Sequence, residues 1–290
     1  MQIGAIFPQP EIGADPQGIQ AYVQAIEEMG YDYLVAYDHV LGVDKSIRPD
    51  WRGVYDSSHM FHEPMVLFGY IAALTKRIGL VSGVIILGQR QTALLAKQAA
   101  EVDVLTGGRL RLGVGIGWNA VEYEALGANF QDRGRRSEEQ AELLRRLWTE
   151  QHVTFEGKWH RVTAAGINPL PVQRPIPLWF GGRAPQLMER IGRIGDGWFP
   201  LGMDPTGDDI RESIDLIKAS ATTAGRDPDA IGIEGSVRLS NGTVSENMGL
   251  LDAWRKLGVS HLSFNTMNVG LQGPDAHLES ARQFMQAIGR

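Results

Sequence analysis

The feature that most constrains the fold is a regular alternation of strand-like and helix-like segments along the 290 residues. The strand-like segments are short and apolar, and each precedes a longer segment in which apolar residues recur at helical spacing. Eight strand–helix units predict an α/β fold, a (β/α)8 TIM barrel, because a doubly wound open sheet usually has fewer units and a second domain. The eight strands are expected at residues 2–7, 33–37, 78–87, 109–115, 175–180, 197–201, 230–237 and 259–264.

Capping residues support the helix assignments. Asp15 followed by Pro16 is typical of a helix start, Gly30 of a helix end, and Glu63-Pro64 and Pro185 open two further helices. A β-hairpin in "HVTFEGKWHRV" is expected as an insertion after the fourth helix. No linker or repeat divides the chain, which predicts one domain over residues 1–290. Other helices are expected at 91–104, 135–150, 206–224, 246–257 and about 275–288.

Composition excludes several classes of protein. The chain has no cysteine, which excludes disulfides, zinc–cysteine sites and a thiol nucleophile. Its formal net charge is -6 without a basic stripe, so no nucleic-acid partner is expected. The longest apolar run, 78–87, is shorter than the roughly 20 residues of a membrane span, and no basic-then-apolar leader begins the sequence. We therefore expect a cytoplasmic protein without a membrane partner.

A glycine-rich stretch, "GIGWNA" at 115–120, has the G-x-G-x-x-A form of a dinucleotide-binding loop. That loop belongs after the first strand of a Rossmann unit, whereas here it follows the fourth strand and precedes a helical segment. In a barrel the stretch lies at the C-terminal end of strand four, where active sites are built. Gly113 is then expected to make room inside the barrel, and Gly117, Trp118 and Asn119 to contact a ligand.

Two other strand ends carry candidate chemistry. Gly181-Gly182-Arg183 lies before a helix N-terminus, which predicts an anion site, with a tight turn as the alternative. Asp38-His39 follows strand two, where the histidine can exchange a proton near neutral pH. On the opposite face we expect an ion pair between Asp103 and Arg109.

A metal site is not expected. His59, His62 and Glu63 lie close together in the sequence, but they lack the ligand spacing of a known metal motif and are typical of a helix entry. An ordinary phosphate-handling barrel, such as an aldolase, predicts a catalytic lysine or paired carboxylates at strand ends. All six lysines fall in expected loops or helices instead.

Taken together, these segments resemble the bacterial luciferase-like superfamily, in the branch of oxidoreductases that use coenzyme F420, an 8-hydroxy-5-deazaflavin. FMN-dependent monooxygenases supplied by a separate reductase are close relatives, and some members bind a flavin without turnover. The resemblance covers nearly the whole chain. It rests on "AYDHV", the stretch from "FHEPMVLFGY" through "GIGWNAVEYEALG", the hairpin "VTFEGKWHRV" and "PLPVQRPIPLWFGGRAPQLMERIGRIGDGWFP".

The resemblance implies hydride transfer at the deazaflavin C5 to or from a small organic substrate, with His39 as the catalytic acid or base. It also implies a homodimer, and a strand-three bulge at Ser82-Gly83 that often carries a non-proline cis peptide. The loop 40–61 is long and aromatic, and we expect it to form a lid. The residues that the resemblance places at the cofactor are Asp38, His39, Ser82, Gly83, Gly115, Gly117, Trp118, Asn119, Gly181, Gly182 and Arg183.

Overall fold

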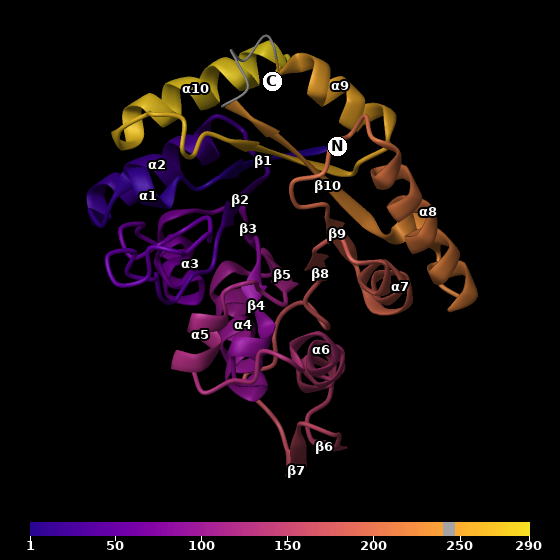
Figure 1. The fold of residues 1–290 in the computed structure, drawn as a ribbon. Helices are drawn as coiled ribbons and strands as arrows, with labels where there is room; N and C mark the ends of the chain where they lie inside the picture. Colours follow the sequence, from indigo (N-terminus) through magenta and orange to yellow (C-terminus); the bar gives the residue numbers. More distant parts are fainter. Residues whose placement is uncertain (240–246) are drawn as a thin grey trace.

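Eight parallel strand positions close into a barrel in the computed structural model, which describes residues 1–239 and 247–290 (Figure 1). The third position is divided into β3 and β4, which both pair with β5 on either side of a bulge. The barrel prediction is therefore confirmed. The strands are β1 (Gln2–Ile6), β2 (Tyr33–Ala36), β3 (Gly79–Ser82), β4 (Ile85–Ile86), β5 (Leu110–Gly115), β8 (Leu178–Gly181), β9 (Gly197–Phe199), β10 (Gly232–Arg238) and β11 (His261–Asn265).

Helices surround the barrel and alternate with its strands (Figure 1). Their bounds agree with the predicted ranges to within a few residues, except that the predicted start at residue 246 lies outside the described residues. The surrounding helices are α2 (Pro16–Glu28), α3 (Pro64–Leu74), α4 (Thr92–Thr106), α6 (Arg133–Thr149), α7 (Pro185–Ile194), α8 (Asp208–Thr223), α9 (Met248–Lys256) and α10 (Gly273–Ala287). The short helices are α1 (Gln9–Ile12), α5 (Ala120–Ala125) and two 3-10 turns, Leu87–Gln89 and Pro228–Ala230. In the described part of the chain no helix is long and apolar enough to cross a membrane.

The capping predictions hold. The Asp15 carboxylate accepts hydrogen bonds from the Gln17 and Gly18 N–H groups, both at 3.1 Å. Glu63 accepts from the Val66 N–H at 2.8 Å, which confirms a helix entry at Glu63-Pro64. Strand β8 begins later than predicted, because Pro175 and Pro177 have no N–H group to donate to a neighbouring strand.

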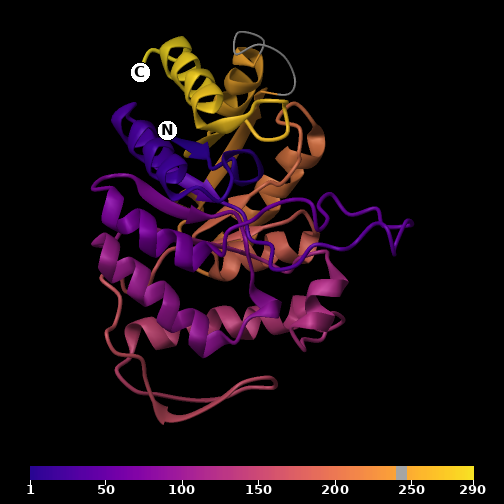
Figure 2. The same ribbon diagram turned by 90° about the vertical axis from the view of Figure 1, so that its left-hand side faces the viewer.

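The predicted hairpin consists of β6 (Val153–Glu156) and β7 (Arg161–Ala165), which project from the barrel (Figure 2). Glu139 on α6 holds its turn, because the carboxylate accepts from the N–H groups of Lys158 at 2.7 Å, Trp159 at 2.9 Å and His160 at 2.7 Å. The hairpin is thus fixed to the outside of the barrel by one partly buried carboxylate.

The barrel interior contains an ion pair. The Arg111 guanidinium on β5 donates to Glu234 on β10 at 2.7 Å and lies 4.2 Å from the Trp179 ring centroid and 4.5 Å from that of Tyr33. Burial raises the pKa of Glu234, and the Arg111 charge opposes that rise. The pair joins two barrel walls that are 123 residues apart in the sequence.

The expected ion pair between Asp103 and Arg109 is wrong. Arg109 donates to the carbonyl oxygens of Thr106 at 2.8 Å and Ile78 at 2.5 Å. Asp103 faces the other way and accepts from the backbone and side-chain nitrogens of Gln173 at 2.9 and 2.7 Å. Each residue instead forms hydrogen bonds with backbone groups at the N-terminal face of the barrel, and the two do so independently of each other.

Gly113 makes room inside the barrel, as the sequence predicts. A Cβ at this position would overlap the Ser82 carbonyl oxygen and the Phe199 ring. We expect Gly113→Ala to lower the free energy of unfolding by about 1–3 kcal/mol, as overpacking of a filled interior does. Urea denaturation would measure this change.

The matched control is Gly69→Ala in α3, where a Cβ would meet nothing within 4 Å. There the substitution should raise stability by about 0.5–1 kcal/mol, because alanine favours a helix interior over glycine. Equal effects of the two substitutions would contradict the packing account of Gly113.

Candidate active site

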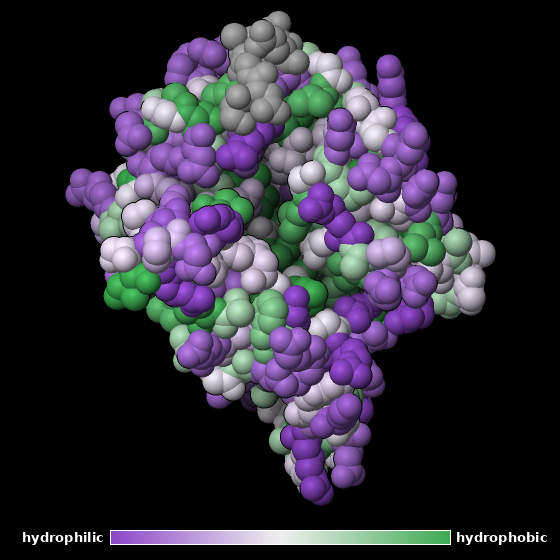
Figure 3. All heavy atoms as spheres, in the orientation of Figure 1, coloured by the Kyte–Doolittle hydropathy of each residue, from purple (hydrophilic) through white to green (hydrophobic). Residues whose placement is uncertain are grey.

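A cavity of about 490 Å³ opens at the C-terminal ends of the barrel strands. One wall is polar because Glu234, Ser236 and Arg238 alternate along β10, so that all three face the interior. Ser263 and Asn265 lie beside them on β11. Figure 3 shows this face of the molecule hollowed near its centre, with hydrophobic residues along the hollow. The facing apolar wall includes Ile6, Val35, Phe199 and Leu201.

His39, at the end of β2, lies beneath an aromatic cover. Its ring centroid is 5.0 Å from that of Tyr55, 4.8 Å from Phe61 and 5.6 Å from Trp118. Two of these rings come from the predicted lid, loop 40–61. The His39 side chain is 13% exposed, and it is Tyr37, two residues earlier, that lines the central cavity.

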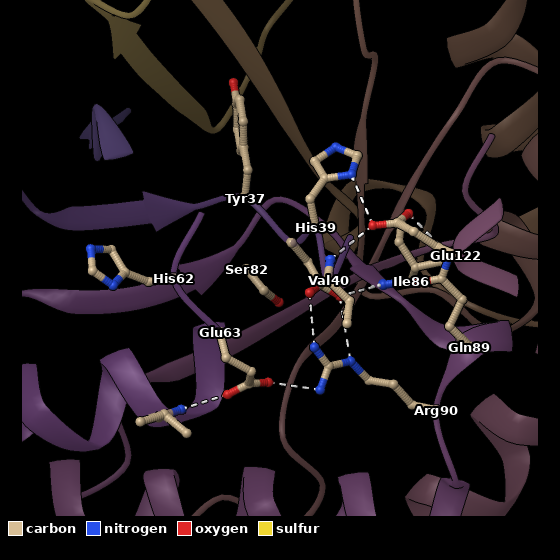
Figure 4. A network of polar contacts seen from close by, with 12 residues as sticks. Tyr37, His39, Val40, His62, Glu63, Ser82, Ile86, Gln89, Arg90 and Glu122 are labelled. Atoms are coloured by element: carbon tan, nitrogen blue, oxygen red, sulfur yellow. Dashed lines mark hydrogen bonds and ion pairs between the residues drawn. The ribbon is translucent and has the colours of Figure 1, made fainter. Parts of the chain in front are cut away.

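Glu122, at the start of α5, fixes the position of His39. Its Oε1 lies 3.4 Å from His39 Nδ1 and accepts from the N–H groups of Val40 at 2.8 Å and Leu41 at 3.2 Å (Figure 4). Its Oε2 accepts from Gln89 at 3.2 Å. Burial acts to raise the pKa of Glu122, but the hydrogen bonds from His39 and the two backbone N–H groups outweigh it and lower that pKa. A carboxylate that accepts this many hydrogen bonds in its charged form can hold the imidazole in one orientation.

Asp38 is turned away from the cavity and into the protein. Its Oδ1 accepts from Arg90 at 2.8 Å, and its Oδ2 accepts from the Ile86 N–H at 3.0 Å. Arg90 also donates to Glu63 at 2.7 Å, so the guanidinium joins two carboxylates (Figure 4). Burial raises the pKa of Asp38, and Arg90 opposes that rise. The structure gives Asp38 a positioning role; its contact with a cofactor stays a prediction.

The predicted bulge in the third strand is present. The non-proline cis peptide is Gly83–Val84, one bond beyond Ser82-Gly83. Ser82 is buried and its hydroxyl donates to the Gly113 carbonyl at 2.8 Å, so it faces β5. Gly83 lines the central cavity, and of the two predicted residues it is the one placed to meet a ligand.

The glycines at the end of β5 and just beyond it make room for Val84 at the bulge and for Ile86 on β4. A Cβ on Gly115 would lie 2.6 Å from Val84, and one on Gly117 would lie 2.7 Å from Ile86. Asn119 is buried and caps α5, accepting from the Val121 N–H at 3.1 Å. The structure therefore accounts for Gly117 and Asn119 through protein contacts. Trp118 is 43% exposed beside His39, and its ligand contact remains a prediction.

A second cavity, of about 410 Å³, begins at Gly115 and Gly181 and is strongly basic. Gly182 has φ +141°, which favours glycine, and with Arg183 and the start of α7 it forms one side. The start of α6 forms another side. Four arginines line this cavity: Arg133, Arg135, Arg183 and Arg190. The predicted loop 181–183 is thus part of a larger cationic site.

Several residues of these sites escaped the sequence analysis. Glu122 follows Asn119 at the spacing of a capping box, which draws attention to the position but predicts a backbone partner, not His39. The arginines at 133 and 135 begin α6, where cations oppose the helix dipole, and that conflict is a sign of an anion nearby. Nothing local distinguishes Glu234, because its partner lies on another wall of the barrel.

Glu122 provides a pH-dependent test. Glu122→Gln keeps the shape of the side chain but removes the negative charge of the carboxylate that accepts hydrogen bonds from His39, Val40 and Leu41. We therefore expect the free energy of unfolding to fall by about 1–3 kcal/mol at pH 7. Because the folded pKa is lowered, the stabilisation is complete above the ordinary glutamate pKa of about 4.3 and is lost as pH falls through the lower folded value. Urea unfolding at pH 7 and at acid pH should show the gap between the two proteins closing in acid.

Glu142→Gln on α6 is the control, because Glu142 is exposed. It should change stability little at either pH. A gap for Glu122→Gln that widens in acid would contradict the proposed ionisation of Glu122.

Comparisons with known proteins agree with this geometry. Residues 3–279 match the luciferase-like monooxygenase family. An uncharacterised protein of Mycobacterium tuberculosis is 32% identical over 208 residues, 70% of this chain and 71% of that one. The FMNH2-dependent dimethylsulfone monooxygenase of Pseudomonas putida is 33% identical over 168 residues, 57% of this chain and 46% of that one. An F420-dependent secondary alcohol dehydrogenase in complex with an F420–acetone adduct has a TM-score of 0.80 at 16% identity, over 100% of this chain and 99% of that one. This chain belongs to the luciferase-like monooxygenase family.

Proposed function

We propose that this protein is an F420-dependent oxidoreductase that transfers a hydride between the deazaflavin C5 and a small organic substrate. The observation that carries the proposal is the cationic cavity at Gly181–Arg183, which is lined by four arginines and begins at Gly115 and Gly181, the two glycines that pack against Val84 next to the bulge. A cofactor that places its ring at the bulge and its anionic end among the arginines fits this arrangement.

The electrostatics of the cationic cavity favour a polyanion. The N-termini of α6 and α7 both reach it, and neither helix has an acidic residue in its first turn. Arg190 pairs with Glu138 at 3.1 Å, but within residues 1–239 and 247–290 no carboxylate forms an ion pair with Arg135 or Arg183. Two helix N-termini and unneutralised guanidinium groups both attract anions.

This charge supports F420 over FMN. F420 continues from its phosphodiester into a carboxylate-bearing tail, whereas FMN ends in one phosphate. Loop 181–183 with the α7 N-terminus suits one phosphate group. Arg135 on α6 can bind a second anionic group, and FMN has no second anionic group to place there.

The residues of the chain itself would then have separate roles around the bound cofactor. The bound cofactor supplies a C5 position that accepts or donates a hydride. Gly83 and Val84 would form the surface behind its ring, and Glu122 holds His39 where it could exchange a proton with the bound cofactor. The aromatic side chains of loop 40–61 exclude water from that side.

The alternative is an FMN-dependent monooxygenase supplied by a separate reductase. The similarity to the dimethylsulfone monooxygenase favours it. A protein that binds a flavin without turnover is a third candidate. For that protein His39→Ala would have no activity to remove, whereas an enzyme should lose turnover.

Fluorescence titration of the purified protein with F420 and FMN, each oxidised and reduced, tests the proposal. We expect micromolar binding of F420 and much weaker binding of FMN. Arg135→Ala should weaken F420 binding about tenfold, because a charge-assisted contact contributes about 1.5–3 kcal/mol and 1.4 kcal/mol is tenfold. The same change should affect FMN little.

Arg282→Ala on α10 is the matched control, because Arg282 pairs with Glu279 on the surface of a different helix. It should leave both affinities unchanged. Preferential binding of FMN would favour the monooxygenase, and binding of neither cofactor would contradict the proposal as a whole.

We also propose a homodimer through the outer faces of α3 and α4. Helix α3 has no charged residue, and a helix that is apolar all round is normally covered. Val66 is 72% exposed and Leu94 on the adjacent α4 is 52% exposed. A second copy can cover both helices by a two-fold axis, since each presents the same apolar patch to the other.

Val66→Glu should raise the dimer dissociation constant at least about tenfold, because it would bury an unpaired carboxylate. Sedimentation velocity over a concentration series measures the change. Ile47→Glu is the control, since Ile47 is 79% exposed and lies on loop 40–61. A wild-type protein that is monomeric at all concentrations would exclude the interface.

A further inference from the structure

Few groups that line the central cavity carry a proton that a reaction can use. Among the described residues they are Tyr37, Asp204, Glu234, Ser236 and Ser263. Asp204 accepts hydrogen bonds from the Thr206 N–H and hydroxyl, both at 2.8 Å, and these lower its pKa, so it is not a proton donor at neutral pH. His39 lies outside this lining, because Tyr55, Phe61 and Trp118 surround its ring, so the proton exchange proposed for it would serve the cofactor and not a substrate in the cavity. Glu234 is committed to Arg111 at 2.7 Å, and serine hydroxyls are weak acids. Tyr37 is therefore the candidate proton donor on the cavity side.

The backbone holds Tyr37 firmly beside the bulge. Its carbonyl accepts from Gln9 at 3.0 Å, which anchors the residue just beyond β2. Its ring atom Cε1 lies 3.6 Å from the position that a Cβ on Gly83 would occupy. The ring thus packs on Gly83, next to the surface where the proposed function places the cofactor ring. Figure 4 shows Tyr37 pointing away from the network around Arg90.

The surroundings of the phenol keep it protonated. Burial, first, and the nearby Tyr55 raise the pKa of Tyr37, the charge of Arg238 opposes this, and Glu234 adds to the rise. The group is thus neutral and able to donate at neutral pH. Arg238, also in the cavity lining, provides positive charge near any phenolate that forms.

We infer that Tyr37 is a catalytic residue that donates its hydroxyl proton to the oxygen of a carbonyl substrate. This inference rests on the proposed function and names its substrate class. The hydride from the reduced deazaflavin bonds to the carbonyl carbon, and the electron pair of the C=O π bond moves to oxygen. That oxygen takes the Tyr37 proton and forms an alcohol, and solvent reprotonates the phenolate. The alkoxide being quenched is a stronger base than a phenolate, so a high tyrosine pKa does not prevent the transfer.

Carbon-13 NMR of acetophenone labelled at its carbonyl carbon tests the contact without turnover. The probe is added to cofactor-free protein and to protein loaded with F420. A hydrogen bond from Tyr37 should shift the bound carbonyl resonance downfield, and Tyr37→Phe should abolish that shift. Tyr70→Phe on α3 is the matched control, because the Tyr70 hydroxyl donates to the Pro16 carbonyl on the outside of the barrel. It should leave the resonance unchanged.

Single-turnover oxidation of reduced F420 by acetophenone separates proton transfer from hydrogen bonding. Tyr37→Phe should slow the step by about 10²–10⁴-fold with the F420 dissociation constant unchanged, as loss of a general acid does. Tyr37→Gln should keep part of the NMR shift and remain slow, because an amide donates a hydrogen bond but not a proton.

An unchanged carbonyl resonance in Tyr37→Phe, wild-type rates in both variants, or no binding of acetophenone would each overturn the inference. Failure of the proposed function appears separately, as failure of F420 to bind the wild-type protein. In that case the NMR experiment on cofactor-free protein still tests the hydrogen bond from Tyr37.

Discussion

The buried carboxylate of Asp38 sets the arrangement on which both cavities depend. An ionised group removed from water is tolerated only when it is paired and hydrogen-bonded. Here the Ile86 N–H and Arg90 supply those partners, so the end of β2 is bound to β4 and, through Glu63, to the start of α3. The short strand β4 is thereby fixed after the bulge. Its position is a consequence of where Asp38 finds its hydrogen bonds.

Fixing β4 explains the glycines that end β5 and β8. Val84 presses against Gly115 on one side and Gly181 on the other, where a Cβ would lie 2.6 and 2.9 Å from its methyl groups. Leu201 lies beside them, 3.1 Å from the same position on Gly181. Val84 therefore packs against the two glycines at which the cationic cavity begins, and it directly follows Gly83, which lines the central cavity.

Sequence periodicity was sufficient for the barrel, because each strand and helix is determined largely by local apolar spacing and capping. It also located the strand ends that precede His39 and Arg183. It predicted one continuous strand over 78–87, where the structure has β3 and β4, and only the family resemblance indicated the bulge at Gly83. It missed Glu122, which contacts residues about 80 positions away, and the pair Arg111–Glu234, which crosses the barrel. Tyr37 was missed for another reason: at the end of an apolar strand, it has the sequence pattern of a core residue. A local sequence pattern cannot identify the hydrogen-bond partner of a buried polar group when that partner lies far away in the sequence.

The two cavities are built from different parts of the chain, so each can vary in sequence independently of the other. The cationic cavity is formed by β5, β8 and the starts of α6 and α7, whereas the polar wall of the central cavity comes from β10 and β11. Substitutions at Ser236 or Asn265 can alter the shape offered to a substrate without moving an arginine of the other cavity. The hydrogen bonds of Asp38 join the end of β2 to β4 and so fix the strands beside both cavities. A barrel of this construction can change the shape of its central cavity while it keeps the cationic one, provided that Asp38 keeps its two partners.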